Sequence, residues 1–102
     1  MNRSLVQRVV IFSGLVQGVG FRFNAHQVSE RFSVAGTIEN LPDGTVKLVA
    51  QGTRSELEAF VHAIVHSTRG RVTHIETTES LIESSSENID PSTTFNGFSI
   101  RR

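Results

Sequence analysis

The sequence predicts a single α+β domain over residues 1–102, in which two helices cover one face of an antiparallel sheet of four to five strands. Three observations support this prediction. Segments with the apolar spacing of strands are interleaved with two segments of helical spacing. Turns that contain glycine or proline separate these segments. A chain of 102 residues is long enough for one sheet with helices on one side, and too short for a second core.

The first half of the chain predicts a strand, a helix and a hairpin. Residues 5–12 are apolar on both faces, as a central strand is. Three glycines interrupt this pattern within residues 13–20. The helix that follows has an apolar face made of Phe21, Ala25, Val28 and Phe32. Residues 34–39 and 45–50 are predicted to be the arms of a hairpin, because Pro42-Asp43-Gly44 is a strong turn signal.

The second half predicts another helix and further extended segments. Thr53 and Glu56 have the spacing of a capping box, which places the start of a helix there. The apolar face of this helix is the cleanest amphipathic pattern in the chain and consists of Leu57, Phe60, Val61, Ile64 and Val65. Residues 72–82 are predicted to be extended, residues 84–94 to be a polar loop, and residues 95–100 to contain a last short strand.

The order of these elements defines a topology. Two consecutive strand–helix–strand units give the split, ferredoxin-like βαββαβ arrangement, with the optional fifth strand at the C-terminal end. Many unrelated functions occur on this arrangement, so the site residues must decide the activity.

Composition narrows the function classes. Ten Lys and Arg balance ten Asp and Glu, so the formal net charge is zero and nothing attracts nucleic acid over long range. RNA binding on the open sheet face would also need stacking aromatics and a basic surface, and the chain has no Tyr or Trp. No segment resembles a signal peptide or a membrane span. We therefore expect a cytoplasmic protein, without membrane or nucleic-acid partners, that is a monomer.

No metal or cofactor is predicted. The chain has no cysteine, which excludes disulfides and thiolate zinc sites. His62 and His66 have a spacing that can bind zinc, but a third ligand does not accompany them.

The glycine-broken segment before the first helix has the composition of an anion site. Gly18 and Gly20 permit backbone angles closed to other residues and allow close approach of a ligand. The N-terminus of the following helix leaves N–H groups unpaired, and Arg22 adds a guanidinium that grips two phosphate oxygens at once. The alternative is that these glycines only make a tight strand-to-helix turn.

Asn40 is the second candidate. It has the same strand parity as Gly36 and Ile38, the set expected to face the helices, and so lies at the end of the inner face near the loop. The alternative is a turn asparagine that hydrogen-bonds its own backbone before Pro42. Glu39 is expected on the opposite face of the sheet.

Together these motifs resemble the acylphosphatase family. The resemblance rests on Gly14-x-Val16-Gln17-Gly18-Val19-Gly20-Phe21-Arg22, on Gly36-x-Ile38-x-Asn40-Leu41-Pro42-Asp43-Gly44-x-Val46 and on Gln51-Gly52, and it extends from about residue 8 to 72. Members of this family have the ferredoxin-like fold and hydrolyse the anhydride between a carboxylic acid and phosphate, which implies a small-molecule acyl phosphate as substrate.

The resemblance also implies roles for individual residues. Arg22 would bind the phosphoryl group together with loop N–H groups, and Asn40 would orient the attacking water. The substrate-binding set it implies is Gln17, Gly18, Val19, Gly20 and Phe21 from the loop, with Thr45 from the hairpin. The alternative function is a non-catalytic module that binds an anion such as carbamoyl phosphate, because similar domains occur in larger carbamoyl-transferring proteins.

Overall fold

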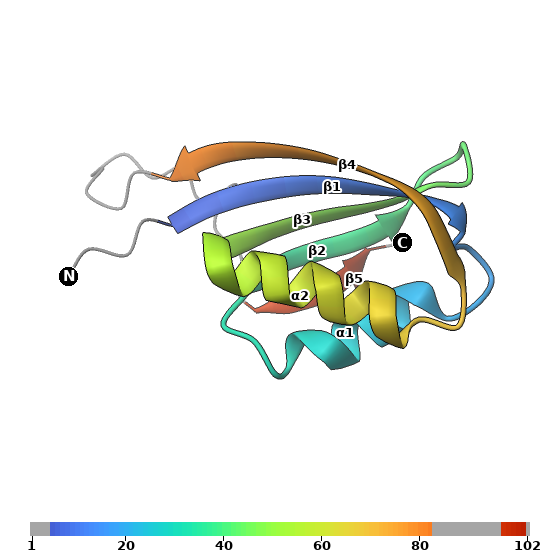
Figure 1. Cartoon of the computed structure of the whole chain (residues 1–102), viewed down its shortest axis with the longest axis horizontal. Coiled ribbons are helices and arrows are strands. Elements are labelled where there is room, and N and C mark those ends of the chain that lie inside the picture. Colours follow the sequence, from blue (N-terminus) through green and yellow to red (C-terminus); the bar gives the residue numbers. More distant parts are fainter. Residues whose placement is uncertain (1–4, 83–96, 102) are drawn as a thin grey trace.

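The structure is a computed structural model that describes residues 5–82 and 97–101. Its elements follow the chain as β1 (Leu5–Leu15), α1 (Phe21–Ser29), β2 (Ala35–Asn40), β3 (Val46–Thr53), α2 (Arg54–Ser67), β4 (Arg71–Ile82) and β5 (Phe98–Arg101) (Figure 1). The predicted loop over residues 84–94 lies outside the described residues. Neither of the two described helices is long and apolar enough to cross a membrane.

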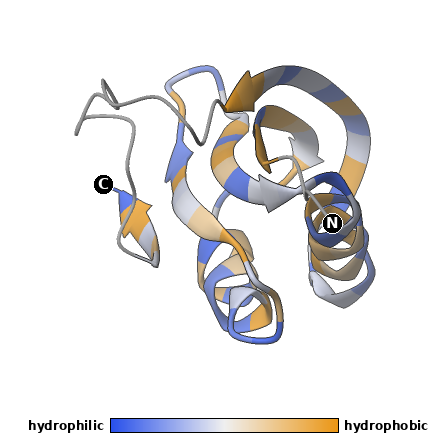
Figure 2. Ribbon diagram, turned by 90° about the vertical axis from the view of Figure 1, so that its left-hand side faces the viewer, coloured by the Kyte–Doolittle hydropathy of each residue, from blue (hydrophilic) through white to orange (hydrophobic). Residues whose placement is uncertain are grey.

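The strands form one sheet in the order β4-β1-β3-β2-β5, and both helices lie on the same face of it (Figures 1 and 2). β1 has a neighbour on each side, as its two apolar faces predicted. The predicted ferredoxin-like α+β fold is therefore confirmed.

The prediction of a purely antiparallel sheet was wrong at one edge, because β5 pairs with β2 in parallel. The pairing of Leu5 with Ile82 places the end of β4 beside the start of β1. β1 and β2 are both antiparallel to β3 and so run in the same direction. A strand that starts at the end of the sheet where β4 finishes must run in that direction too, which makes its pairing with β2 parallel.

The core lies between the sheet and the two helices. Alternate positions of the strands turn toward the helices and are buried, and Figure 2 shows apolar and polar residues alternating along the strands. The buried apolar residues are Val6, Val10, Phe12, Val16, Ile38, Val46, Leu48 and Ala50 with Phe21, Ala25, Val28, Leu57, Phe60 and Ile64. The rings of Phe12 and Phe21 lie 5.0 Å apart and join β1 to α1. Phe32 follows α1 instead of lying within it, and its ring packs 5.9 Å from that of Phe60.

The start of α2 only half matches the predicted capping box. Thr53 is the N-cap, and its hydroxyl accepts a hydrogen bond from the N–H of Glu56 at 3.3 Å. The Glu56 carboxylate does not complete the box, because it accepts from the N–H of Ser33 at 2.7 Å. The side chain therefore connects α2 to the segment before β2.

An ionic cluster joins the other side of α2 to the sheet. Arg8 lies between Val6 and Val10 on the helix-facing side of β1, where it reaches Glu79 of β4 at 2.8 Å and Glu58 of α2 at 3.3 Å. Arg54 contacts the second oxygen of Glu79 at 2.7 Å. Hydrogen bonds from Arg54 and then Arg8 lower the pKa of Glu79 from its ordinary 4.5 to about 2.

This shift predicts an acid-sensitive contribution of Glu79 to stability. The pKa of Glu79 is lowered in the folded protein, so its contribution is complete above about 4.5 and is lost as the pH falls toward about 2. In Glu79→Gln the midpoint of thermal unfolding should fall less steeply over this interval than in the wild type. Glu76→Gln, on the opposite face of β4, is the control. Parallel curves for Glu79→Gln and the wild type would contradict the prediction.

Candidate functional site

The loop between β1 and α1 has the backbone conformation that its glycines predicted. Gly18 and Gly20 have φ values of 76° and 74°, in the left-handed region, where a side chain costs about 1 kcal/mol or more. An added Cβ would meet no atom within 4 Å at either position, so conformation and not crowding requires glycine there. Gly20 is the N-cap of α1 and leaves the helix start without a capping side chain.

The amides of this loop are available to a ligand. Within residues 5–82 and 97–101, the N–H groups of Gly18 through Arg22 have no hydrogen-bond acceptor. They surround the positive end of α1, the arrangement that binds anions in many proteins. Arg22, in the first turn of α1, is half-buried and donates from Nη1 to the carbonyl of Arg101 in β5 at 3.2 Å. This single contact to a neutral acceptor orients the guanidinium and leaves its other donors for an anion.

Asn40 is the last residue of β2 and lies on the helix-facing side of the sheet. Its partner across the hairpin is Val46, which is buried in the core. The side-chain amide of Asn40 has no hydrogen-bond partner among the described residues, so it is free to hold a water molecule. Glu39 lies on the opposite face, as predicted, between Lys47 of β3 and Arg101 of β5.

These pieces meet in one cavity of roughly 530 Å³. Its walls are Val16, Gly18, Gly20, Phe21, Arg22, Phe23, Asn40 and Ile100. The end of β1, the start of α1 and the end of β2 thus contribute a ring of free amides, a guanidinium and a neutral amide side chain to the same space. Strand parity and the family resemblance predicted that Arg22 and Asn40 lie close together, and both residues line this cavity.

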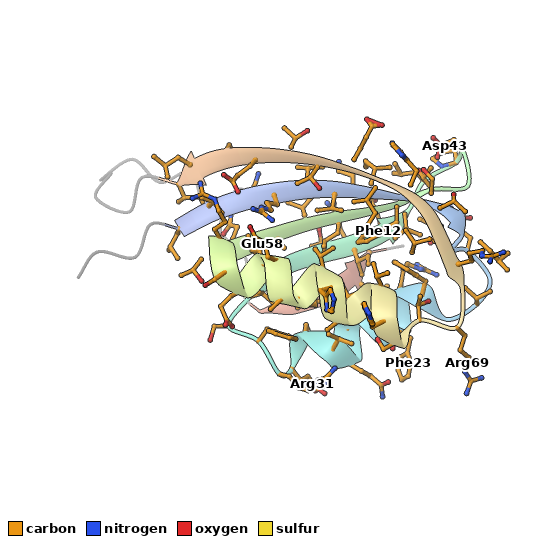
Figure 3. The ribbon with its side chains drawn as sticks, viewed as in Figure 1. Phe12, Phe23, Arg31, Asp43, Glu58 and Arg69 are labelled. Carbon is orange, nitrogen blue, oxygen red and sulfur yellow. The ribbon has the colours of Figure 1, made fainter. Side chains whose placement is uncertain are left out.

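Gln17 and Thr45 have a different position from the one expected of ligand-binding side chains. The Gln17 amide donates to the carbonyls of Leu41 and Thr45, both at 2.8 Å, and so attaches the loop to the hairpin. The Thr45 hydroxyl and N–H both donate to Asp43, at 2.6 and 3.1 Å, and these bonds lower the pKa of Asp43. Asp43 lies at the tip of the hairpin (Figure 3). Neither side chain lines the cavity.

Comparison with known proteins identifies the family of this chain. A family model described as acylphosphatase matches residues 8–100. The chain belongs to the acylphosphatase family. An acylphosphatase of Bacillus subtilis is 38% identical over 77 residues, which are 74% of this chain and 85% of that protein. One from Methanospirillum hungatei is 41% identical over 63 residues, 62% of this chain and 69% of that protein. The crystal structure of the acylphosphatase from Bacillus subtilis matches with a TM-score of 0.77 at 34% identity, covering 95% of this chain and 99% of that one.

The acylphosphatase resemblance seen in the sequence is thereby confirmed, but sequence reasoning missed three members of the cavity wall. Val16, Phe23 and Ile100 received no functional assignment. Phe23 had a usable signal, because it lies off the core face of α1 defined by Phe21 and Ala25. An aromatic ring at such a position is exposed, and 61% of Phe23 is accessible. Figure 3 shows it on the side of α1 away from the sheet.

None of the histidines in the described part of the chain lines this cavity. The rings of His62 and His66 stack at 4.0 Å on α2, and Nδ1 of His66 lies 3.1 Å from the carbonyl of His62. No group of three or more metal-ligating side chains occurs among residues 5–82 and 97–101. His26 lies on α1, where its ring is 6.2 Å from that of Phe98.

The contacts of Gln17 predict a role in holding the site together. Gln17→Ala removes two hydrogen bonds to hairpin carbonyls, which keep only their backbone donors, the N–H groups of Gly44 and Leu41, and should cost about 1–3 kcal/mol in the free energy of unfolding. Urea unfolding checks this value. Gln27→Ala, which removes an exposed glutamine from α1, is the matched control. Equal losses in the two variants would mean that the Gln17 bridge contributes nothing to stability.

Proposed function

We propose that this chain is an acylphosphatase that hydrolyses the carboxyl–phosphate bond of acyl phosphates to a carboxylate and inorganic phosphate, without a metal or cofactor. The observation that carries the proposal is the shared cavity, in which Arg22, the unpaired amides of the loop and Asn40 converge. Membership of the acylphosphatase family supports the same reaction.

Phosphate binding is assigned to Arg22 and the loop. The phosphoryl oxygens would accept from the N–H groups of Gln17 through Arg22, while the guanidinium of Arg22 provides a second, forked set of donors. Fixed donors of this kind stabilise charge in the transition state without reorganisation, since they are already oriented before the substrate arrives. The Gln17 bridge and the left-handed glycines supply that orientation.

Water activation is assigned to Asn40. Its amide would hold a water in line with the bond to be broken, and the water oxygen attacks phosphorus as the bond to the acyl oxygen breaks. The electron pair of that bond leaves with the carboxylate, a good leaving group that needs no general acid. The proton of the water passes to a phosphate oxygen of the substrate, so the reaction needs a positioned water more than a strong base.

The proposal also covers the oligomeric state, location and partners of the protein. The small cavity and zero net charge support a small-molecule substrate and no nucleic-acid partner, and the proposed enzyme is monomeric and cytoplasmic.

Arg22→Lys tests the phosphate grip. A lysine provides a point charge where the site needs a planar fork, so kcat/KM for benzoyl phosphate should fall about 100-fold or more. The assay follows absorbance with EDTA present. Arg31→Lys, an exposed arginine beyond α1, is the control and should keep wild-type turnover. Near-normal activity of Arg22→Lys would overturn the assigned role.

Asn40→Ala separates catalysis from binding. The variant should fold and bind inorganic phosphate like the wild type, while kcat falls about 100- to 1,000-fold, because only the water loses its partner. Loss of phosphate binding would instead assign Asn40 to the shape of the loop. If inorganic phosphate raises the midpoint of thermal unfolding of the wild type, but the wild type hydrolyses no acyl phosphate, the protein is the non-catalytic anion-binding module.

A further inference from the structure

A second cavity adjoins the first on the outer side of the loop. Its volume is roughly 430 Å³, and its wall includes Val19, Gly20, Phe23, Asn24, Gln27 and Arg69. Gly20 and Phe23 belong to both cavities. The proposed phosphate-binding cavity therefore continues past the ring of Phe23 into a more polar space. No step of the proposed reaction involves this space.

Arg69 reaches this space because the turn between α2 and β4 packs tightly against the loop. At Gly70 an added Cβ would lie 2.1 Å from the Leu15 carbonyl oxygen and 2.9 Å from a methyl of Val19, so only glycine allows this approach. The amide of Asn24 donates to the hydroxyl of Ser67 at 2.8 Å and joins α1 to the end of α2. Figure 3 shows Arg69 and Phe23 at the same end of the molecule.

The side chains of Arg69 and Phe23 are both exposed and available to a ligand. Among the described residues, Arg69 has no acidic partner, and its side chain is exposed. Phe23 is 61% exposed, although it lies directly after Arg22. A free guanidinium beyond an accessible aromatic ring matches a ligand with an apolar body and an anionic end.

The reaction geometry directs the acyl group toward these two residues. In phosphoryl transfer the attacking and leaving oxygens lie roughly in line on opposite sides of phosphorus. Asn40 holds the water on the sheet side of the cavity, so the acyl oxygen departs on the side away from the sheet. Phe23 lies on that outer side of α1.

We propose that Phe23 and Arg69 bind the acyl part of the substrate, and that the site prefers acyl phosphates whose acyl group carries a second anionic group at its far end. The apolar body of the acyl group lies against the Phe23 ring, and the distal carboxylate or phosphate contacts Arg69. This inference rests on the proposed function for the position of the phosphate.

Binding of two phosphonates that cannot be hydrolysed tests the inference. The compounds are benzylphosphonate and (4-carboxybenzyl)phosphonate, measured by titration calorimetry at low ionic strength. The wild type should bind the carboxylated compound about three-fold more tightly, and added salt should reduce this preference, as for an exposed ion pair. In Arg69→Gln the preference should disappear. Arg31→Gln, which removes the same charge elsewhere, should retain it.

Phe23→Ala tests the other half. This variant should bind both phosphonates several-fold more weakly and inorganic phosphate as the wild type does, because the ring contacts only the acyl part. Equal weakening of inorganic phosphate would assign Phe23 to the shape of the loop and overturn its role. A preference that survives in Arg69→Gln, or is absent from the wild type, would overturn the role of Arg69.

The outcomes also separate this inference from the proposed function. Wild-type hydrolysis of benzoyl phosphate reports the function alone. If the wild type hydrolyses benzoyl phosphate, but Arg69→Gln and Phe23→Ala bind both phosphonates as the wild type does, the proposed function stands and the acyl site is rejected. An Arg69-dependent preference in a protein without turnover keeps the acyl site and rejects the function. Absence of phosphonate binding in the wild type rejects the acyl site directly.

Discussion

The site depends on the crossover that leads from β1 through α1 to β2. Both strands are antiparallel to β3, which lies between them, so their C-terminal ends lie at the same end of the sheet. The glycine loop after β1 and Asn40 at the end of β2 therefore both lie there. Ligand sites form at strand ends in this way in other α/β arrangements, since the chain turns there and leaves polar groups unpaired. The cavity is thus a consequence of chain direction, and the residue types at its rim decide what it binds.

A loop that must leave its amides free for a ligand cannot use them to stabilise itself. The protein resolves this conflict with side chains and backbone angles. Gln17 makes two hydrogen bonds to carbonyls of the hairpin, and these involve none of the N–H groups that face the cavity. Gly18 and Gly20 adopt left-handed backbone angles, which occur in the turns that present backbone amides to anions. Arg22 is held by a single carbonyl of β5, so this edge strand contributes to the site through its backbone as well as through Ile100 in the cavity wall.

Periodicity predicted the elements of this fold because each buries one face against the same core. It also placed Asn40 inward and Glu39 outward, since strand parity follows directly from the pleat. The errors concern interactions that local patterns do not encode. The direction of β5 depends on where β4 ends, and the acceptor role of Glu56 depends on Ser33, which is distant in sequence. The contacts of Thr45 and Gln17 likewise follow from how the hairpin and the loop meet, whereas the exposure of Phe23 could have been predicted from the periodicity of the helix.

The absence of net charge is compatible with an anion site because the positive potential is local. Arg22 and the start of α1 line the first cavity, and Arg69 lines the second cavity beside it. The nearest acidic residue in sequence to Asn40, Glu39, lies on the other face of the sheet between Lys47 and Arg101, so its carboxylate does not face the anion site. Glu58 and Glu79 are paired with Arg8 and Arg54 at the opposite side of α2. Arg22 and Arg69 have no acidic partner among residues 5–82 and 97–101 and lie where an anionic substrate would bind, so the attraction is short-ranged and selects small anions over polyanions.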